Sequence, residues 1–376
     1  MEQKIELDKV QEDEGRGVSY AKRRSKKRRK KKKILKKILL FLLILIIILA
    51  GGCVYLFFSG KAKLKEKGDA SRPELKPVNT KDVKIDTEIL DEDTLKYNGV
   101  KYKYNDEMMN FLFLGTDTSG AIFEGEKEGE AGQADTIILA ALDNRNKKIT
   151  LIPVNRDTMT EISIYDIYGK FVRKQKEQLA LAYSYGDGEK KSAELTEEAV
   201  SNLFYGLPIH GYFAINTSAI AILNDLVGGV EVTLLDDFSF VDPSYKQGTV
   251  VRLQGDFAET YLRGRTDVGD GTNVSRMERQ QQYLAALTSQ MLVAVRNDLT
   301  LPVSIYKTVT DYMVTDISAD EVSYLATQAV TCSLNDNFIR NISGESAPGD
   351  VYMEFTADEK ALYELILDIF YEKIED

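Results

Sequence analysis

The sequence predicts an α/β fold in which helices sandwich a mixed central β-sheet, with a transmembrane helix near the N-terminus. First, short apolar stretches typical of buried strands alternate with longer stretches of helical periodicity. Second, the apolar stretches 135–143 and 149–154 are joined by a short polar connection, which favours an antiparallel hairpin. Third, residues 38–58 carry no charge. As a helix they reach about 31 Å, enough to cross a hydrocarbon core of ~30 Å.

Composition limits the chemistry that the chain can perform. With 376 residues, 43% of them hydrophobic, it can bury one large core with appendages. Its two cysteines are too few for a disulfide framework or a zinc site. The single histidine, His210, argues against most Ser-His-Asp and Cys-His schemes, and we expect it to be structural. Chemistry must therefore rest on carboxylates, arginines, lysines, hydroxyls or a metal held by oxygen.

Charge is distributed very unevenly along the chain. Residues 1–37 carry sixteen basic and six acidic residues, whereas the rest is strongly acidic. The basic run directly precedes the apolar segment and lacks interleaved aromatics, which favours anionic lipid headgroups over nucleic acid as its partner. By the positive-inside rule the N-terminus is cytoplasmic and the rest extracytoplasmic. The predicted parts are a basic cytoplasmic tail (1–37), a transmembrane helix (38–58), an extracytoplasmic stalk (59–95), a catalytic domain (96–300) and a C-terminal helical extension packed on it (301–376).

The elements of the catalytic domain follow from local patterns. Residues 100–104 alternate like an exposed strand, and 109–117 resemble a buried strand that ends in a turn. The hairpin strands 135–143 and 149–154 come next. The acidic segment 124–134 before them resembles a flexible loop that could act as a lid. The later elements are a helix (194–207), a strand (209–218), a helix ending in Gly-Gly (219–229), a strand (230–235), a helix (255–265) and a long amphipathic helix capped by Ser275 (275–295). In the C-terminal extension, helices and one strand (351–355) are expected.

Polar residues recur where the apolar strands end. Asp117 follows one strand, Asp135 opens the next, and Arg156-Asp157 follow the third. In a hairpin, Asp135 and Arg156 would be neighbours, with Asp117 close if its strand runs parallel to the one that ends at Arg156. Two carboxylates can hold a divalent cation, and arginine offers a bidentate fork for phosphate. Alternatively, each is a turn residue in a weak surface ion pair.

A second basic cluster surrounds a glycine-rich loop. Arg263 and Arg265 end one helix, and Arg276 and Arg279 lie in the first turn of the next. Basic residues at a helix N-terminus oppose the helix dipole, so helix stability does not explain them. A glycine-rich loop beside a helix N-terminus suits phosphate or pyrophosphate. Arg263 and Arg265 could instead only complement the end of their helix.

Together these segments resemble the LytR-CpsA-Psr family of cell-envelope phosphotransferases, from about Met108 to Gln282. The matching motifs are `FLFLGTD`, `ADTIILAALD`, `ITLIPVNRDT`, `AINTSAIAILNDLVGGVEVT` and `YLRGR…D…SRMERQQ`, in the family's order. The resemblance implies a membrane-anchored enzyme that transfers glycan phosphate from a polyprenyl-pyrophosphate-linked precursor to peptidoglycan. The glycan could be teichoic acid, capsular polysaccharide or another wall polymer.

The resemblance also implies roles for particular residues. Asp117 and Asp135 would hold Mg²⁺, with Mn²⁺ as an alternative. The lipid tail would enter the apolar layer between sheet and helices. The residues expected to act on the pyrophosphate or line its site are Arg156, Arg263 and Arg265 as a clamp, Asp157 as support for Arg156, and Asp270, Arg276, Arg279 and Gln280 as further binding residues, with Asp117 as a possible base.

The sequence departs from the family at three places and leaves alternatives open. Asn155 stands where proline is common, Thr-Ser-Gly follows Asp117 where an arginine is frequent, and the spacing from Asp117 to Asp135 is long. A hydrolase acting on the same lipid-linked glycan, or a non-catalytic carrier or sensor of polyprenyl pyrophosphate, would use the same residues.

Overall fold

A computed structural model describes residues 55–68, 73–75, 78–79, 84–118, 132–264, 268–271, 273–349 and 351–374. The predicted tail (1–37), most of the predicted span (38–58), most of the acidic loop and Arg265 lie outside these residues. Within the described part of the chain, no helix is both long enough and apolar enough to cross a membrane. The chain divides into two compact units, Met1–Leu56 and Phe57–Asp376, and the β-sheets and hydrophobic cores belong to the second.

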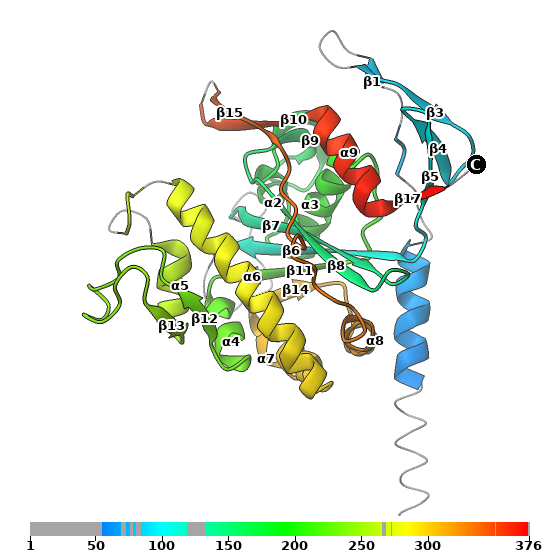
Figure 1. Cartoon of the computed structure of the whole chain (residues 1–376). Helices are drawn as coiled ribbons and strands as arrows, with labels where there is room; N and C mark the ends of the chain where they lie inside the picture. Colours follow the sequence, from blue (N-terminus) through cyan, green and yellow to red (C-terminus); the bar gives the residue numbers. More distant parts are fainter. Residues whose placement is uncertain are drawn as a thin grey trace, which may run out of the picture. The chain divides into compact units, whose positions relative to one another are not determined.

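A five-stranded mixed sheet forms the centre of this second unit (Figure 1). β6 pairs parallel with β11, and every other pairing in the sheet is antiparallel. The predicted mixed sheet and the predicted hairpin are both confirmed. The strand order is β14 (Met313–Thr315), β11 (Tyr212–Asn216), β6 (Met108–Thr116), β7 (Ala134–Asp143) and β8 (Lys148–Val154).

The central strand β6 is buried on both faces because its alternate side chains enter different apolar clusters. Leu112 and Leu114 belong to the main core, to which α3 (Lys190–Leu203) and α9 (Glu359–Phe370) contribute. Met109 and Phe111 point to the opposite face and pack with residues of α8 (Ala319–Ala329). The sheet is therefore covered by helices on both sides, as the sequence predicts.

A second core lies beside the sheet. It is built from β12 (Val230–Thr233), β13 (Val250–Leu253), α5 (Asp256–Arg263) and the long helix α6 (Asn273–Asn297), with α4 (Ser218–Leu226) against it. The expectation that Ser275 caps the long helix is wrong. The helix already includes Asn273 and Val274, so Ser275 lies within its first turn.

Residues 55–68 are helical, and from Phe57 onward this helix packs on α8. Leu64 is fully buried, Lys63 pairs with Asp320 at 2.9 Å, and Lys67 pairs with Asp316 at 2.9 Å. This part of the predicted stalk (59–95) is thus a packed helix and not an extended spacer. The difference arises because one buried leucine in a charged segment is too weak a signal to predict a packed helix.

The segment predicted as a helical extension (301–376) contains strands as well as α7 (Leu301–Val309), α8 and α9. β14 completes the central sheet, and β17 (Tyr371–Ile374) pairs with β5 (Val100–Tyr104). The remaining elements are β1 (Val78–Asn79), β2 (Lys84–Ile85), β3 (Thr87–Ile89), β4 (Thr94–Tyr97), β9 (Met159–Tyr165), β10 (Phe171–Gln178), α2 (Leu181–Ser184), η1 (Thr310–Tyr312), β15 (Gly344–Pro348) and β16 (Met353–Ala357).

Candidate active site

A β-bulge places Asp135 at the edge of the central sheet. Gly115 of β6 pairs with Thr136, but Thr116 pairs with Ala134, so Asp135 is the extra residue on β7. Asp135 and Thr136 are consecutively exposed, between the buried Ala134 and Ile137. A bulge bends its strand and re-aims a side chain without losing the pairing on either side. The side chain of Asp135 therefore does not follow the alternation of buried and exposed side chains along this strand.

Arg156 meets Asp135 across the hairpin. Val154, the last residue of β8, pairs with Ile137, and continuing that register sets Arg156 opposite Asp135. One guanidinium nitrogen of Arg156 forms an ion pair with the Asp135 carboxylate, and another donates to the side-chain oxygen of Gln133. The expectation that Asp135 and Arg156 are neighbours is confirmed, and β6 runs in the same direction as β8.

The turn after β8 fixes the backbone of Arg156. The Asn155 side-chain oxygen accepts a hydrogen bond from the Asp157 amide at 3.0 Å, and the Asn155 carbonyl accepts one from the Thr158 amide at 3.0 Å. The Ala180 amide donates to the carbonyl of Arg156 at 3.0 Å. Asparagine hydrogen-bonds its own backbone two residues on, which stabilises a tight turn. Asn155 thus closes this turn at the position where proline is common in the family.

Asp157 lies beside Arg156 and is itself held in place. Its carboxylate is 3.6 Å from Nε of Arg156, and Nε2 of Gln178 donates to it at 3.1 Å. Burial raises the pKa of Asp157, while the positive charges of Arg156 and Arg276 lower it. Arg276, in the first turn of α6, therefore lies within electrostatic range of this carboxylate. Asp157 therefore lies where it can orient Arg156, and that role stays a prediction.

Gln133 connects Asp117 to Arg156. The Asp117 amide donates to the Gln133 carbonyl at 3.2 Å, and the Gln133 amide donates to Oδ1 of Asp117 at 2.8 Å. The neighbouring Gly132 has φ +70°, and a Cβ there would collide with the same carboxylate oxygen. Glycine is thus required both for the backbone conformation and for space. The arrangement fixes Asp117 at the edge that carries Asp135.

These two carboxylates are compatible with magnesium but do not form a complete cage. Asp117 and Asp135 are both exposed. Among the described residues there is no cluster of three or more Asp, Glu, His or Cys side chains suited to a metal. Mg²⁺ commonly takes only one or two carboxylates and completes its shell with water and phosphate oxygens. The residues present therefore fit a cation bound together with a phosphate ligand.

An incompletely covered apolar surface leads along the sheet toward this edge. Phe113 lies on the central strand β6, yet 42% of its surface is exposed. Its ring stacks on that of Phe213 at 5.2 Å between centroids, and its half-buried partner on β7 is Ile138. Phe113 and Asp117 are four residues apart, or about 13 Å along a strand. Apolar surface and charged edge therefore lie within reach of one amphipathic ligand.

The side chain of Arg279 lies in the second core, against the ring of Phe238. Its side chain is fully buried and pairs with the carboxylate of Asp236. The same guanidinium donates to the carbonyls of Tyr261, at 2.9 Å, and Gly264. The expectation that Arg279 lines the substrate site stays a prediction. Gln280 donates to the carbonyl of Leu262 at 3.2 Å, so it also holds the end of α5.

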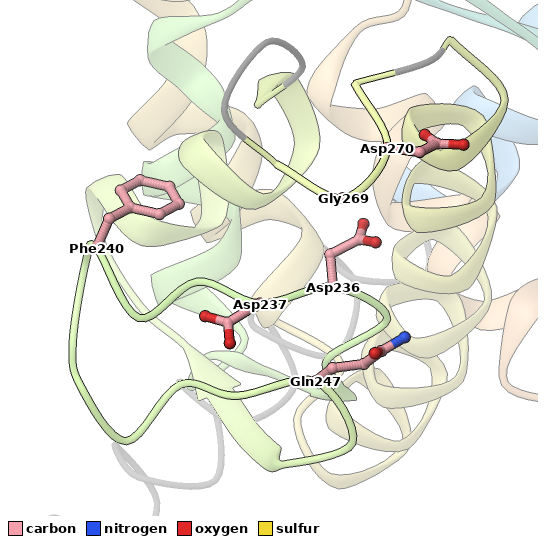
Figure 2. A pocket seen from close by; sticks show the side chains of 6 residues that line it. All are labelled: Asp236, Asp237, Phe240, Gln247, Gly269 and Asp270. Atoms are coloured by element: carbon pink, nitrogen blue, oxygen red, sulfur yellow. The ribbon is translucent and has the colours of Figure 1, made fainter.

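Arg263 and Asp270 lie on the surface beside this second core. Arg263 pairs with Glu259 of its own helix at 2.7 Å, and its side chain is half exposed. Asp270 is exposed and lines a polar cavity of about 630 Å³ (Figure 2). In Figure 2 the carboxylates of Asp236 and Asp270 come from two loops that face each other across this cavity. The complete lining is Asp236, Asp237, Phe240, Gln247, Gly269 and Asp270.

The predicted residues thus fall into two groups. Asp117, Asp135, Arg156 and Asp157 are joined directly or through Gln133, and the charge of Arg276 acts on Asp157. Arg263, Asp270, Arg279 and Gln280 surround the second core. Sequence reasoning missed Gln133 and Gln178. Gln133 immediately precedes `ADTIILAALD`, so the hairpin register could have indicated it, whereas no local signal marks Gln178.

A family model described as the LytR_cpsA_psr family matches residues 75–365. The chain belongs to this family. The match extends beyond the segment 108–282 in which the motifs lie, and it includes most of the C-terminal region. The matched range contains the central sheet, its hairpin and the turn that carries Arg156.

Individual relatives agree with this assignment. The chain is 30% identical to the polyisoprenyl-teichoic acid–peptidoglycan teichoic acid transferase TagU of Enterococcus faecalis over 59% of this chain and 66% of that protein. The aligned part spans between about half and two thirds of the first curated relatives. The fold resembles that of protein gbs0355 from Streptococcus agalactiae (TM-score 0.54, 21% identity, 72% of this chain and 91% of that chain). It also resembles Bacillus subtilis TagV (TM-score 0.51, 23% identity, 70% and 95%).

Proposed function

We propose that the protein transfers glycan phosphate from a polyprenyl-pyrophosphate-linked precursor to peptidoglycan. Teichoic acid is the first candidate glycan because the curated relative from Enterococcus faecalis is named for it. We further propose that residues 38–58 anchor the chain in the membrane, with the N-terminus cytoplasmic and the sheet domain outside. The uncharged segment and the basic run before it support this topology. On this model the partners are the lipid-linked glycan, peptidoglycan and the membrane itself.

One observation carries the proposal. Arg156 is held between the carboxylates of Asp135 and Asp157. This charged group lies at the end of an apolar sheet face on which Phe113 is exposed. A polyprenyl pyrophosphate has the same two parts, an apolar chain and a charged head. Phosphoryl transfer depends mainly on positioning and on neutralising charge, which a fixed guanidinium provides.

In the proposed reaction, a sugar hydroxyl of peptidoglycan attacks the phosphorus that carries the glycan. The new phosphate–oxygen bond forms as the bond to polyprenyl phosphate breaks, and polyprenyl phosphate leaves with the electron pair. The hydroxyl proton passes to a carboxylate, for which Asp117 is the candidate. Arg156 binds the pyrophosphate oxygens, and Asp157 keeps its guanidinium oriented. Mg²⁺ held by Asp117 and Asp135, or Mn²⁺ in its place, would neutralise charge on the pyrophosphate. Arg263, Arg265 and Arg276 would add positive charge at the glycan-phosphate side.

The test uses the full chain in detergent with a polyprenyl-pyrophosphate glycan and peptidoglycan oligomers. Mass spectrometry follows the phosphodiester-linked product with Mg²⁺ and with chelator, for wild type and Arg156→Ala. We expect metal-dependent product that falls by about 10²–10³ in the variant, the usual effect of removing one preorganised donor. Free glycan phosphate in place of linked product would favour a hydrolase. Tight binding of the lipid without turnover would favour a carrier or sensor.

A further inference from the structure

We infer that Arg279 is a positioning residue, which acts on phosphate only through the backbone that carries Arg263. This inference rests on the proposed function for its substrate, and on the contacts of the second core for its geometry. Arg279 is 0% exposed, and because the helix begins at Asn273 it lies in the second turn and not in the first as expected. Arginine is almost never fully buried unless it is paired, so its partners indicate what it does.

The three partners of Arg279 come from two separate segments, the end of α5 and the loop that carries Asp236. Nε donates to the carbonyl of Tyr261 at 2.9 Å, another nitrogen donates to the carbonyl of Gly264, and the third binds the carboxylate of Asp236. The first two acceptors flank Arg263 in sequence. Carbonyl groups at the end of a helix lack partners within the helix, and a cation there also complements the helix dipole. Arg279 thus fixes the turn from which Arg263 projects.

Asp236 extends the same clamp to the far side of the loop. A Cβ on Gly269, which has φ +60°, would collide with the Asp236 carboxylate, so the two lie in direct contact. Val268 beside it is buried in the second core. The guanidinium also lies over the ring of Phe238, 5.8 Å from its centroid. One buried ion pair therefore holds the end of α5 and residues 268–269 against the same core.

Lysine cannot replace this arginine. The planar fork of arginine reaches three acceptors in different directions, whereas the lysine ammonium is a compact point charge on a flexible stem. Arg279→Lys keeps the charge and loses the geometry. Asp236→Asn keeps the shape of the partner and loses its charge. Both changes should release the backbone around Arg263 while the rest of the domain stays folded.

The experiment compares wild type, Arg279→Lys, Asp236→Asn and Leu253→Ala. Leu253 is a fully buried residue of the same core whose side chain cannot hydrogen-bond to either member of the pair, so its variant controls for general destabilisation. Hydrogen exchange is measured by mass spectrometry on peptides that cover residues 261–271, at a temperature where every variant is folded. We expect exchange there to accelerate about tenfold in the first two variants and not in Leu253→Ala. Unchanged exchange would overturn the inference.

A binding measurement then separates positioning from direct contact. Inorganic pyrophosphate with Mg²⁺ is titrated by calorimetry into wild type, Arg279→Lys, Arg263→Ala and the double variant. If Arg279 acts through Arg263, the two single losses should be non-additive. Weaker binding in Arg279→Lys without faster loop exchange would mean direct contact, and faster exchange with unaltered binding would mean a purely structural role. Either result would overturn the inference. Failure of wild type to form product would refute the proposed function, whereas the exchange result would still decide whether Arg279 holds the loop.

Discussion

At the scale of single residues, the two arginine clusters were predicted with different success. The contact between Arg156 and Asp135 could be predicted because a hairpin converts sequence spacing into register. The surroundings of Arg279 could not, because its acceptors are backbone carbonyls and a carboxylate 43 residues away. The signal was its predicted place in the first turn of a helix, but the helix begins at Asn273 and Arg279 lies in the second turn, where it forms a buried pair with Asp236.

Gln178 is expected to matter for activity although it is not itself expected to contact the substrate. It is buried and bridges the Asp157 carboxylate, at 3.1 Å, and the carbonyl of Met353, at 2.7 Å. Gln178→Ala leaves both acceptors without this donor and loosens the partner of Arg156. We expect transfer to fall about tenfold with a small change in melting temperature. The exposed Lys176→Ala on the same strand is the control, and equal activity of the two variants would contradict this role.

Gly132 offers a test of how tightly Asp117 is positioned. Gly132→Ala would push a Cβ against the carboxylate of Asp117 and strain a backbone with φ +70°. Gly99→Ala has the same kind of backbone strain, at φ +81°, but open space around the added carbon. Both variants should lose about 1 kcal/mol of stability by thermal unfolding. Transfer activity should fall only in Gly132→Ala, and a similar fall in Gly99→Ala would assign the effect to strain alone.

At the scale of elements, strands and helices with a strong apolar pattern could be predicted from the sequence, and those with a weak pattern could not. The buried strand β6 and the hairpin of β7 and β8 follow directly from apolar runs and a short connection. The hairpin of β9 and β10 escaped because `FVRKQKEQ` is almost wholly solvent-facing and lacks an apolar alternation. Residues 59–68 of the N-terminal helix escaped for a similar reason, since Leu64 is their one large apolar core residue in a charged segment.

Leu64 should make the helix that includes it indispensable to the domain. Leu64 is 0% exposed in a cluster with Val322 and Tyr324, and Phe57 packs on Tyr324 at 5.1 Å between ring centroids. Leu64→Ala should lower the free energy of unfolding by about 2–5 kcal/mol, measured by denaturant titration. Leu90→Ala removes the same atoms from an exposed position and should change it by less than about 0.5 kcal/mol. Equal stabilities would show that the helix is only loosely docked.

At the scale of the whole domain, the fold class could be predicted but the number of cores could not. Alternating strands and helices specify a covered mixed sheet whichever elements are missed. The division between the sheet core and the core of β12, β13 and α5 depends on nonlocal packing that no local pattern reports. A group of carboxyls around the half-buried Glu197 adds a property of the whole domain, its response to pH.

Stability should decrease as pH rises from about 4.5 to about 7 because of Glu197. Burial, Asp316 and Glu194 raise its pKa from 4.5 to about 7, against an opposing effect of Lys67. Between these values the folded protein binds a proton that the unfolded chain releases, so raising the pH favours unfolding. Glu197→Gln should therefore stabilise the domain at pH 8 by about 2 kcal/mol and leave it nearly unchanged at pH 4. Thermal unfolding across this range checks it, with the exposed Glu345→Gln as control; parallel profiles for wild type and Glu197→Gln would contradict it.

The pairing of β17 with β5 also has a consequence for how the chain is made. Tyr371 lies opposite Tyr104, and α9 just before it supplies Tyr363, Ile366 and Phe370 to the main core. Contacts between such distant parts of a chain form slowly, because a very long loop must close first. During synthesis the sheet would remain exposed on that face until the ribosome has added α9 and β17. A nascent chain released early should therefore depend on chaperones or be degraded, even though every candidate active-site residue has already been translated.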